Sequence, residues 1–210
     1  MNAHPLLAEL FSSKVRAAVL EWMIPRPHLG ASLTDLSRLL GLPVSSLQHE
    51  CYKLERLGIL SARRSGNARL YRSRPDCPIL PPLAALVAAV IGPVAMLRAA
   101  LEGVAGIDAA FVAGTLPGIQ PDDRPGQPGD PISSGSGTPS PRPRLVIVGD
   151  LSLDTLDAVL GRAETALGLP AGSLELAYFR LDDWHERRTE GSPFVQTLIG
   201  APRLSLVGII

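Results

Sequence analysis

A 27-residue stretch, residues 117–143, limits where this chain can build a hydrophobic core. It contains 8 prolines, 5 glycines and 4 serines, with almost no side chain that can pack. Because such a segment cannot offset the entropy lost on ordering, we expect it to be disordered. The cores must therefore be built from the sequence before it and the sequence after it.

The two ends of the chain differ in charge. Residues 1–76 hold 11 Lys and Arg against 6 Asp and Glu, whereas residues 77–210 hold 9 against 14. An excess of positive charge in the first region alone predicts a polyanionic partner for that region.

The cysteines and the amino-terminal sequence indicate in which cellular compartment the protein is expected. Cys51 and Cys77 have no metal-binding spacing, and no basic-then-apolar signal peptide begins the chain. We therefore expect a reduced, cytoplasmic setting.

Residues 77–104 are predicted to form an apolar connecting helix. The run LAALVAAVIGPVAML (83–97) has no charge, but it is shorter than the roughly 20 residues of a membrane span and is crossed by Gly92-Pro93. We expect a helix kinked near Pro93 that is buried between domains or copies, with no membrane contact. The candidate dimer-interface residues are Leu83, Leu86, Val87, Val90, Val94 and Leu97.

Three helices are predicted before this segment. Residues 5–23 repeat apolar side chains at helical spacing, and residues 32–41 follow a capping pattern in which Ser32 precedes Asp35. Residues 44–58 give the third helix, which Gly58 ends. Two strands, 59–64 and 68–73, then flank a Gly- and Asn-containing hairpin loop.

Three helices followed by a basic hairpin predict a winged helix-turn-helix within residues 1–76. The polar side of the third helix is expected to reach base edges in the major groove, and the hairpin is expected to meet phosphates or the minor groove. The candidate DNA-binding residues are Ser45, Ser46, Gln48, His49, Tyr52, Lys53, Arg63, Arg64, Asn67 and Arg69. The alternatives are a packing module with a solvated hairpin, in which His49 is an ordinary surface residue, and a module that binds protein.

The sequence LTDLSRLLGLPVSSLQHECYKLERLGIL followed by RRSGNARLYR resembles the ArsR-like winged-helix regulators. The resemblance implies a homodimer on two-fold symmetric double-stranded DNA. Many such regulators sense metals through cysteines, but Cys51 falls on the inward side of its helix and is expected to belong to the core.

The second half is predicted to be a small α/β domain spanning residues 105–210, so that the whole chain is α+β. Strands are expected at 107–115, 144–150, 173–180 and 203–209, and helices at 152–167 and within 182–200. The opening ELFSSKVRAAVLEWM and the ending EGSPFVQTLIGAPRLSLVG resemble winged-helix regulators fused to a minimal nucleotidyltransferase-like domain.

The carboxylates that such a transferase needs for its metals are missing. Aligned on the shared VGD strand end, Arg142 and Arg144 occupy their positions, and Gly114-Thr115 stands where the family has Gly-Ser. Guanidinium groups cannot ligate Mg²⁺, and Glu175 alone cannot form a site. Arg142 and Arg144 could bind a phosphate without turnover, or they could be solvated residues that end the insert.

The sequence therefore predicts a DNA-binding transcriptional regulator with a catalytically inactive nucleotidyltransferase-like domain. We expect no catalytic residues, no metal and no cofactor, and an effector, if there is one, could be a small molecule or a protein. The alternative is an active nucleotidyltransferase or antitoxin-like protein that regulates its own expression through the winged helix.

Overall fold

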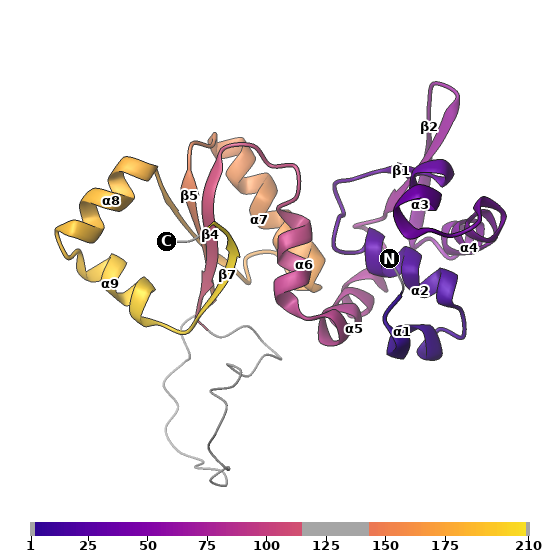
Figure 1. Cartoon of the computed structure of the whole chain (residues 1–210), viewed down its shortest axis with the longest axis horizontal. Helices are drawn as coiled ribbons and strands as arrows, with labels where there is room; N and C mark the ends of the chain where they lie inside the picture. The colour runs from indigo at the N-terminus through magenta and orange to yellow at the C-terminus, as the bar shows by residue number, and fades with distance from the viewer. Residues whose placement is uncertain (1–2, 115–142, 209–210) are drawn as a thin grey trace, which may run out of the picture. The chain divides into compact units, whose positions relative to one another are not determined.

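The computed structural model describes residues 3–114 and 143–208, which divide into two compact units (Figure 1). The first unit comprises Met1–Ala105 and Ser152–Gly172, and the second comprises Gly106–Leu151 and Ser173–Ile210. Both units contain helices and strands, which confirms the α+β class. The expected disorder of residues 117–143 concerns residues outside those described, except for Pro143. The division by function at residues 76 and 104 stays a prediction.

The first unit begins with two helices where the sequence predicted one. Helix α1 spans Pro5–Leu10 and α2 spans Lys14–Met23. The prediction of one helix over 5–23 was wrong because Ser12 adopts a φ of 49° and Ser13 caps α2 by accepting from the Arg16 N–H. A serine hydroxyl that satisfies an orphan N–H favours starting a helix over continuing one.

Helices α3 (Leu33–Leu40) and α4 (Val44–Arg56) follow at the predicted positions. The capping box is confirmed: the Ser32 hydroxyl accepts from the Asp35 N–H, and the Asp35 carboxylate accepts from the Ser32 N–H. Gly41 ends α3 in the left-handed region with a φ of 68°. Four α4 residues are buried in the body of the unit, namely Leu47, Glu50, Cys51 and Leu54.

The predicted hairpin is present, and a short strand joins it. Strands β2 (Leu60–Ser65) and β3 (Ala68–Ser73) are antiparallel, and β1 (Ala31–Ser32) pairs with β3 to give the order β1-β3-β2. The prediction omitted β1 because two residues carry no periodic signal. The hairpin extends away from α1–α4 (Figure 1).

The apolar segment is two helices, so the prediction of one kinked helix was wrong. Helix α5 spans Leu80–Ile91, α6 spans Pro93–Ala100, and they bend by 117° at Gly92, whose φ of 87° breaks the helix. Among the residues described, no helix by itself has the length and apolarity to cross a membrane, and only this bent pair reaches that length when taken together.

Helix α7 (Leu153–Leu167) packs on α5 and α6 within the first unit. This grouping differs from the predicted boundaries, which placed residues 152–167 in the second domain. Of the candidate dimer-interface residues, Val87 and Leu97 are buried within the unit, whereas Leu86 remains exposed. Leu83, Val90 and Val94 are half-buried.

Gly168 sets how closely α7 can approach α5, and we expect Gly168→Ala to lower the free energy of unfolding by about 2–3 kcal/mol. Gly168 has a φ of +70°, and a Cβ there would overlap the Pro81 carbonyl oxygen. Gly161→Ala is the matched control, since Gly161 lies within α7 and a Cβ there meets no atom of another element within 4 Å. Chemical denaturation should show Gly161→Ala stabilised by about 0.5–1 kcal/mol, and equal effects of both changes would contradict the close approach.

The second unit is a four-stranded sheet with two helices on one face (Figure 1). The strands β4 (Ile107–Ala113), β5 (Arg144–Gly149), β6 (Glu175–Phe179) and β7 (Arg203–Val207) lie in the order β6-β5-β4-β7, with only β5 and β6 parallel. Helices α8 (Leu181–Thr189) and α9 (Pro193–Gly200) supply Trp184, Val195 and Leu198 to the core on that face.

Candidate nucleic-acid interface

A groove of about 420 Å³ separates the exposed side of α4 from the hairpin. Apart from Leu33 of α3, its lining is polar or aromatic and comes from α4 and β3, namely Ser45, Gln48, His49, Tyr52, Arg69 and Tyr71. Five of these seven residues belong to the predicted DNA-binding set. The groove therefore brings together predicted residues from both the helix and the hairpin.

The exposed side of α4 presents one continuous stripe. Ser45, His49 and Tyr52 follow one another at helical spacing and are exposed, with Tyr52 exposed by 60%. Gln48 is exposed beside them, whereas Ser46 and Lys53 lie at the margin of this face and are half-buried.

Arg56 continues this stripe, and the sequence prediction missed it. It lies four residues after Tyr52 and seven after His49, and it is exposed. The spacing 45, 49, 52, 56 was the signal that could have identified it, because residues three and four apart share a helix face.

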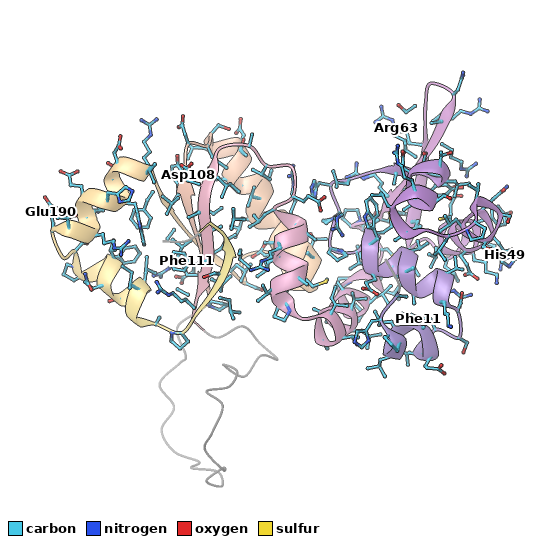
Figure 2. All side chains as sticks on the ribbon, viewed as in Figure 1. Phe11, His49, Arg63, Asp108, Phe111 and Glu190 are labelled. Atoms are coloured by element: carbon cyan, nitrogen blue, oxygen red, sulfur yellow. The ribbon has the colours of Figure 1, made fainter. Side chains whose placement is uncertain are left out.

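The hairpin carries arginines on both of its faces. Arg64 lies directly opposite Arg69, on the face of β2–β3 that also carries Tyr71, whereas Arg63 is opposite Leu70 on the other face. Figure 2 shows Arg63 on the hairpin and His49 on α4. Asn67 is exposed in the two-residue turn after Gly66, whose φ is 58°.

Arg69 is held by groups of the protein itself. Its Nη2 lies 2.6 and 2.7 Å from the two carboxylate oxygens of Glu55 on α4, and its guanidinium lies 5.6 Å from the Tyr71 ring centroid. The hydrogen bond that Arg69 donates to the Glu55 carboxylate raises the pKa of Arg69, which therefore stays charged. The ion pair connects the last turn of α4 to the hairpin.

A second ion pair fixes α4 against α2. The buried Glu50 carboxylate accepts from Arg16 Nε at 2.8 Å and from the Ser13 hydroxyl at 3.4 Å. The Lys53 ammonium lies 3.8 Å from the same carboxylate. The position and direction of α4 are therefore determined by both apolar and ionic contacts.

Internal pairing changes which cations of the first region can meet a polyanion. Within the parts of the chain described here, neither Arg56 nor Arg63 nor Arg64 has an ion-pair partner, and all three are exposed. The close ion pairs that involve arginines of residues 1–76 are Arg16–Glu50, Arg26–Glu102, Arg38–Asp35, Arg69–Glu55 and Arg74–Asp76. Among the arginines of this region, exposed charge without an ion-pair partner thus lies on the end of α4 and on the hairpin.

Cys51 lies in the core, as the sequence predicted. It is 0% exposed, and burial raises the pKa of its thiol to about 12. A thiol that stays protonated is neither a metal ligand nor a ready nucleophile.

We expect the Cys51 thiol in the folded protein to resist alkylation at pH 8, because only about one part in 10⁴ would be thiolate. A Cys77→Ser variant leaves Cys51 as the one thiol, and its mass after treatment with an alkylating reagent reports the reaction. The same variant unfolded in guanidinium should react fully. Rapid stoichiometric labelling of the folded variant would contradict the burial.

The second unit holds one of the two arginines predicted to bind phosphate. The Arg144 guanidinium forms an ion pair with Glu175 on the neighbouring strand and lies 5.2 Å from the Phe194 ring centroid on α9. Arg142 lies outside the described residues. Since Glu175 and Phe194 already contact the guanidinium, an anion would have to share Arg144 with a carboxylate.

No group of three or more His, Cys, Asp or Glu that could hold a metal ion occurs among residues 3–114 and 143–208. Comparison with protein-family models, with curated proteins and with solved structures finds no match to this chain.

Proposed function

We propose that residues 1–76 are a winged helix-turn-helix that binds double-stranded DNA, with α4 in the major groove and the β2–β3 hairpin as the wing. The observation that carries the proposal is the groove that places the polar stripe of α4 beside an arginine-bearing hairpin. The major groove is wide enough to admit a helix, and the two elements would contact neighbouring parts of one duplex.

On α4, the exposed side chains suit the reading of base edges. Gln48 can both donate to and accept from adenine, and the His49 ring can donate to guanine. Ser45 lies in the first turn of the helix, where hydroxyl and backbone N–H groups commonly meet phosphates. Arg56 at the other end of the stripe would contact the backbone.

On the hairpin, Arg63 and Arg64 point to opposite faces. A two-stranded tip with a cation on each face can enter the narrow minor groove and reach the phosphates on either side. These contacts carry affinity rather than sequence information, and they make binding dependent on salt.

We further propose that the chain is a transcriptional regulator that acts as a homodimer. Leu86 on α5 and Ile79 before it are exposed apolar residues in a region without charge between Asp76 and Arg98. Such a surface suits contact with a second copy. Two copies on a two-fold symmetric site would present two α4 helices to successive major grooves.

For the second unit, we propose a nucleotidyltransferase-like domain without catalytic activity. Support comes from Arg144, which forms an ion pair with Glu175 where an active enzyme needs metal-binding carboxylates. Transfer from labelled nucleoside triphosphates in the presence of Mg²⁺, lost on Glu175→Ala, would favour the alternative of an active enzyme.

The experiment that tests DNA binding is fluorescence anisotropy of the full chain with two duplexes, one from upstream of its own coding sequence and one of mixed sequence. We expect salt-dependent binding to both and binding that is tighter by about 10³-fold or more to a duplex that contains an operator. A regulator of other genes would bind both duplexes alike, whereas failure to bind either at low salt would overturn the proposal.

A further inference from the structure

We infer that Arg69, which the sequence placed among the DNA contacts, is a positioning residue whose ion pair with Glu55 fixes the angle of the hairpin against α4. This inference rests on the proposed DNA binding and assigns a separate role within it. Arg63 and Arg64 would then meet the phosphates, while Arg69 would hold them at the correct distance from the helix.

The geometry of the contact carries the inference. One terminal nitrogen of Arg69 lies 2.6 and 2.7 Å from the two oxygens of Glu55, fourteen residues earlier in the sequence. The carboxylate belongs to the last turn of α4, and the guanidinium belongs to β3. The contact therefore joins the two elements that must engage the same duplex.

The Arg69 side chain is fixed from a second direction as well. Its guanidinium lies 5.6 Å from the centroid of the Tyr71 ring, and Tyr71 is 3% exposed and pairs with Ala31 of β1. Because Tyr71 is buried in the sheet, the guanidinium contacts a packed ring on one side and the Glu55 carboxylate on another. A side chain restrained on two sides cannot easily reorient to reach a phosphate. It is better suited to holding the hairpin at a fixed distance from α4.

The Glu55–Arg69 ion pair also reduces the charge repulsion within the hairpin. Arg64 and Arg69 are directly opposite each other on the two strands, and facing like charges destabilise a strand pair. The Glu55 carboxylate offsets one of these two charges and leaves Arg64 without an ion-pair partner in the described part of the chain. The hairpin tip can therefore carry a cation on each face without repulsion from Arg69.

The competing assignment, in which Arg69 itself contacts a phosphate, predicts a different salt dependence. Each phosphate that a cation neutralises contributes about 0.9 to the slope of log affinity against log salt concentration. A positioning residue changes how often the free hairpin has the angle that binds, while the bound complex keeps its phosphate contacts, so the slope is unaltered. The slope therefore separates the two roles, which affinity alone does not.

The test uses the full chain and a mixed-sequence duplex of about three helical turns, with affinity measured over a series of salt concentrations. The variants are Arg64→Ala, Arg69→Ala and the double variant Glu55→Ala/Arg69→Ala. The double variant keeps the net charge of the wild type, so any loss of affinity in it comes from the lost contact. An exposed pair adds little to stability, so all three variants should unfold at nearly the wild-type temperature.

We expect Arg64→Ala to lower the slope by about 0.9 and Arg69→Ala to leave it unchanged. The double variant should bind about fivefold more weakly at an unchanged slope. A slope loss in Arg69→Ala equal to that in Arg64→Ala would overturn the inference, as would wild-type affinity in the double variant. Absence of salt-dependent binding by the wild type would instead remove the proposed function, and this inference with it.

Discussion

Replacing Arg56, Arg63 and Arg64 together with alanine is expected to weaken DNA binding by about 100-fold near 0.15 M salt, if each lost phosphate contact costs roughly 1 kcal/mol. The slope of log affinity against log salt concentration should fall by about 2.7 for each bound copy, since three phosphates would no longer be neutralised.

The choice of these three arginines depends on the ion pairs. All three are exposed and have no carboxylate partner within the described residues, whereas Arg16, Arg26, Arg38 and Arg74 already neutralise acidic groups of the protein. A paired arginine that meets a phosphate must give up its carboxylate, which reduces the net gain. Removal of the unpaired arginines should therefore weaken DNA binding more than removal of the paired arginines.

The matched control removes three exposed arginines from the second unit, namely Arg187, Arg188 and Arg203. Both triple variants lose the same charge, so a general effect of net charge would weaken them equally. We expect the control to bind within about threefold of the wild type, because the proposed DNA contacts belong to α4 and the hairpin and none of them to these three arginines. A control as weak as the test variant would contradict the assignment of the interface to α4 and the hairpin.

Local chemistry explains most of what the sequence could predict in the first region. The capping box of Ser32 and Asp35, the left-handed Gly41 and the two-residue hairpin turn are decided by neighbours a few residues apart. The buried face of α4 follows from helical spacing alone. The opposite, polar face of α4 follows from the same spacing, which is why four of the six contact residues predicted on α4 line the groove.

Contacts between residues distant in sequence explain what the prediction missed. Glu50 and Glu55 both lie on α4 and look alike in the sequence, yet one is buried against Arg16 and the other reaches Arg69 on the hairpin. No spacing rule connects Arg16 to Glu50 across the helices between them. The role of each arginine could therefore not be predicted before its ion-pair partner was known.

Helix breaks were the second source of error. At Ser12 and at Gly92 the apolar repeat continues on both sides of the break, so the repeat predicts one helix in each place. The backbone turns at each point because a following Ser13 or Pro93 starts a new helix. The grouping of α7 with α5 and α6 depends on packing that chain order does not reveal.

The second large effect is expected at Trp184, where substitution by alanine should lower the free energy of unfolding by about 3–5 kcal/mol. Trp184 is 1% exposed. The centroid of its ring lies 5.1 Å from the ring centroid of Phe179 and 6.0 Å from that of Phe111, and both pairs are edge-to-face. Loss of the indole leaves a cavity between α8 and the sheet and also removes both aromatic contacts. Chemical denaturation followed by circular dichroism measures the change.

Two controls show whether packing is the cause. Trp184→Phe should cost less than about 2 kcal/mol, because a ring still fills most of the site and no hydrogen-bond partner of the indole N–H is left unpaired within the described residues. His185→Ala, at the exposed neighbouring position on α8, should change stability by less than about 0.5 kcal/mol. If Trp184→Ala were no more destabilising than His185→Ala, then α8 would not be packed on the sheet through this ring. A large loss in Trp184→Phe as well would mean that the site needs the full volume of the indole.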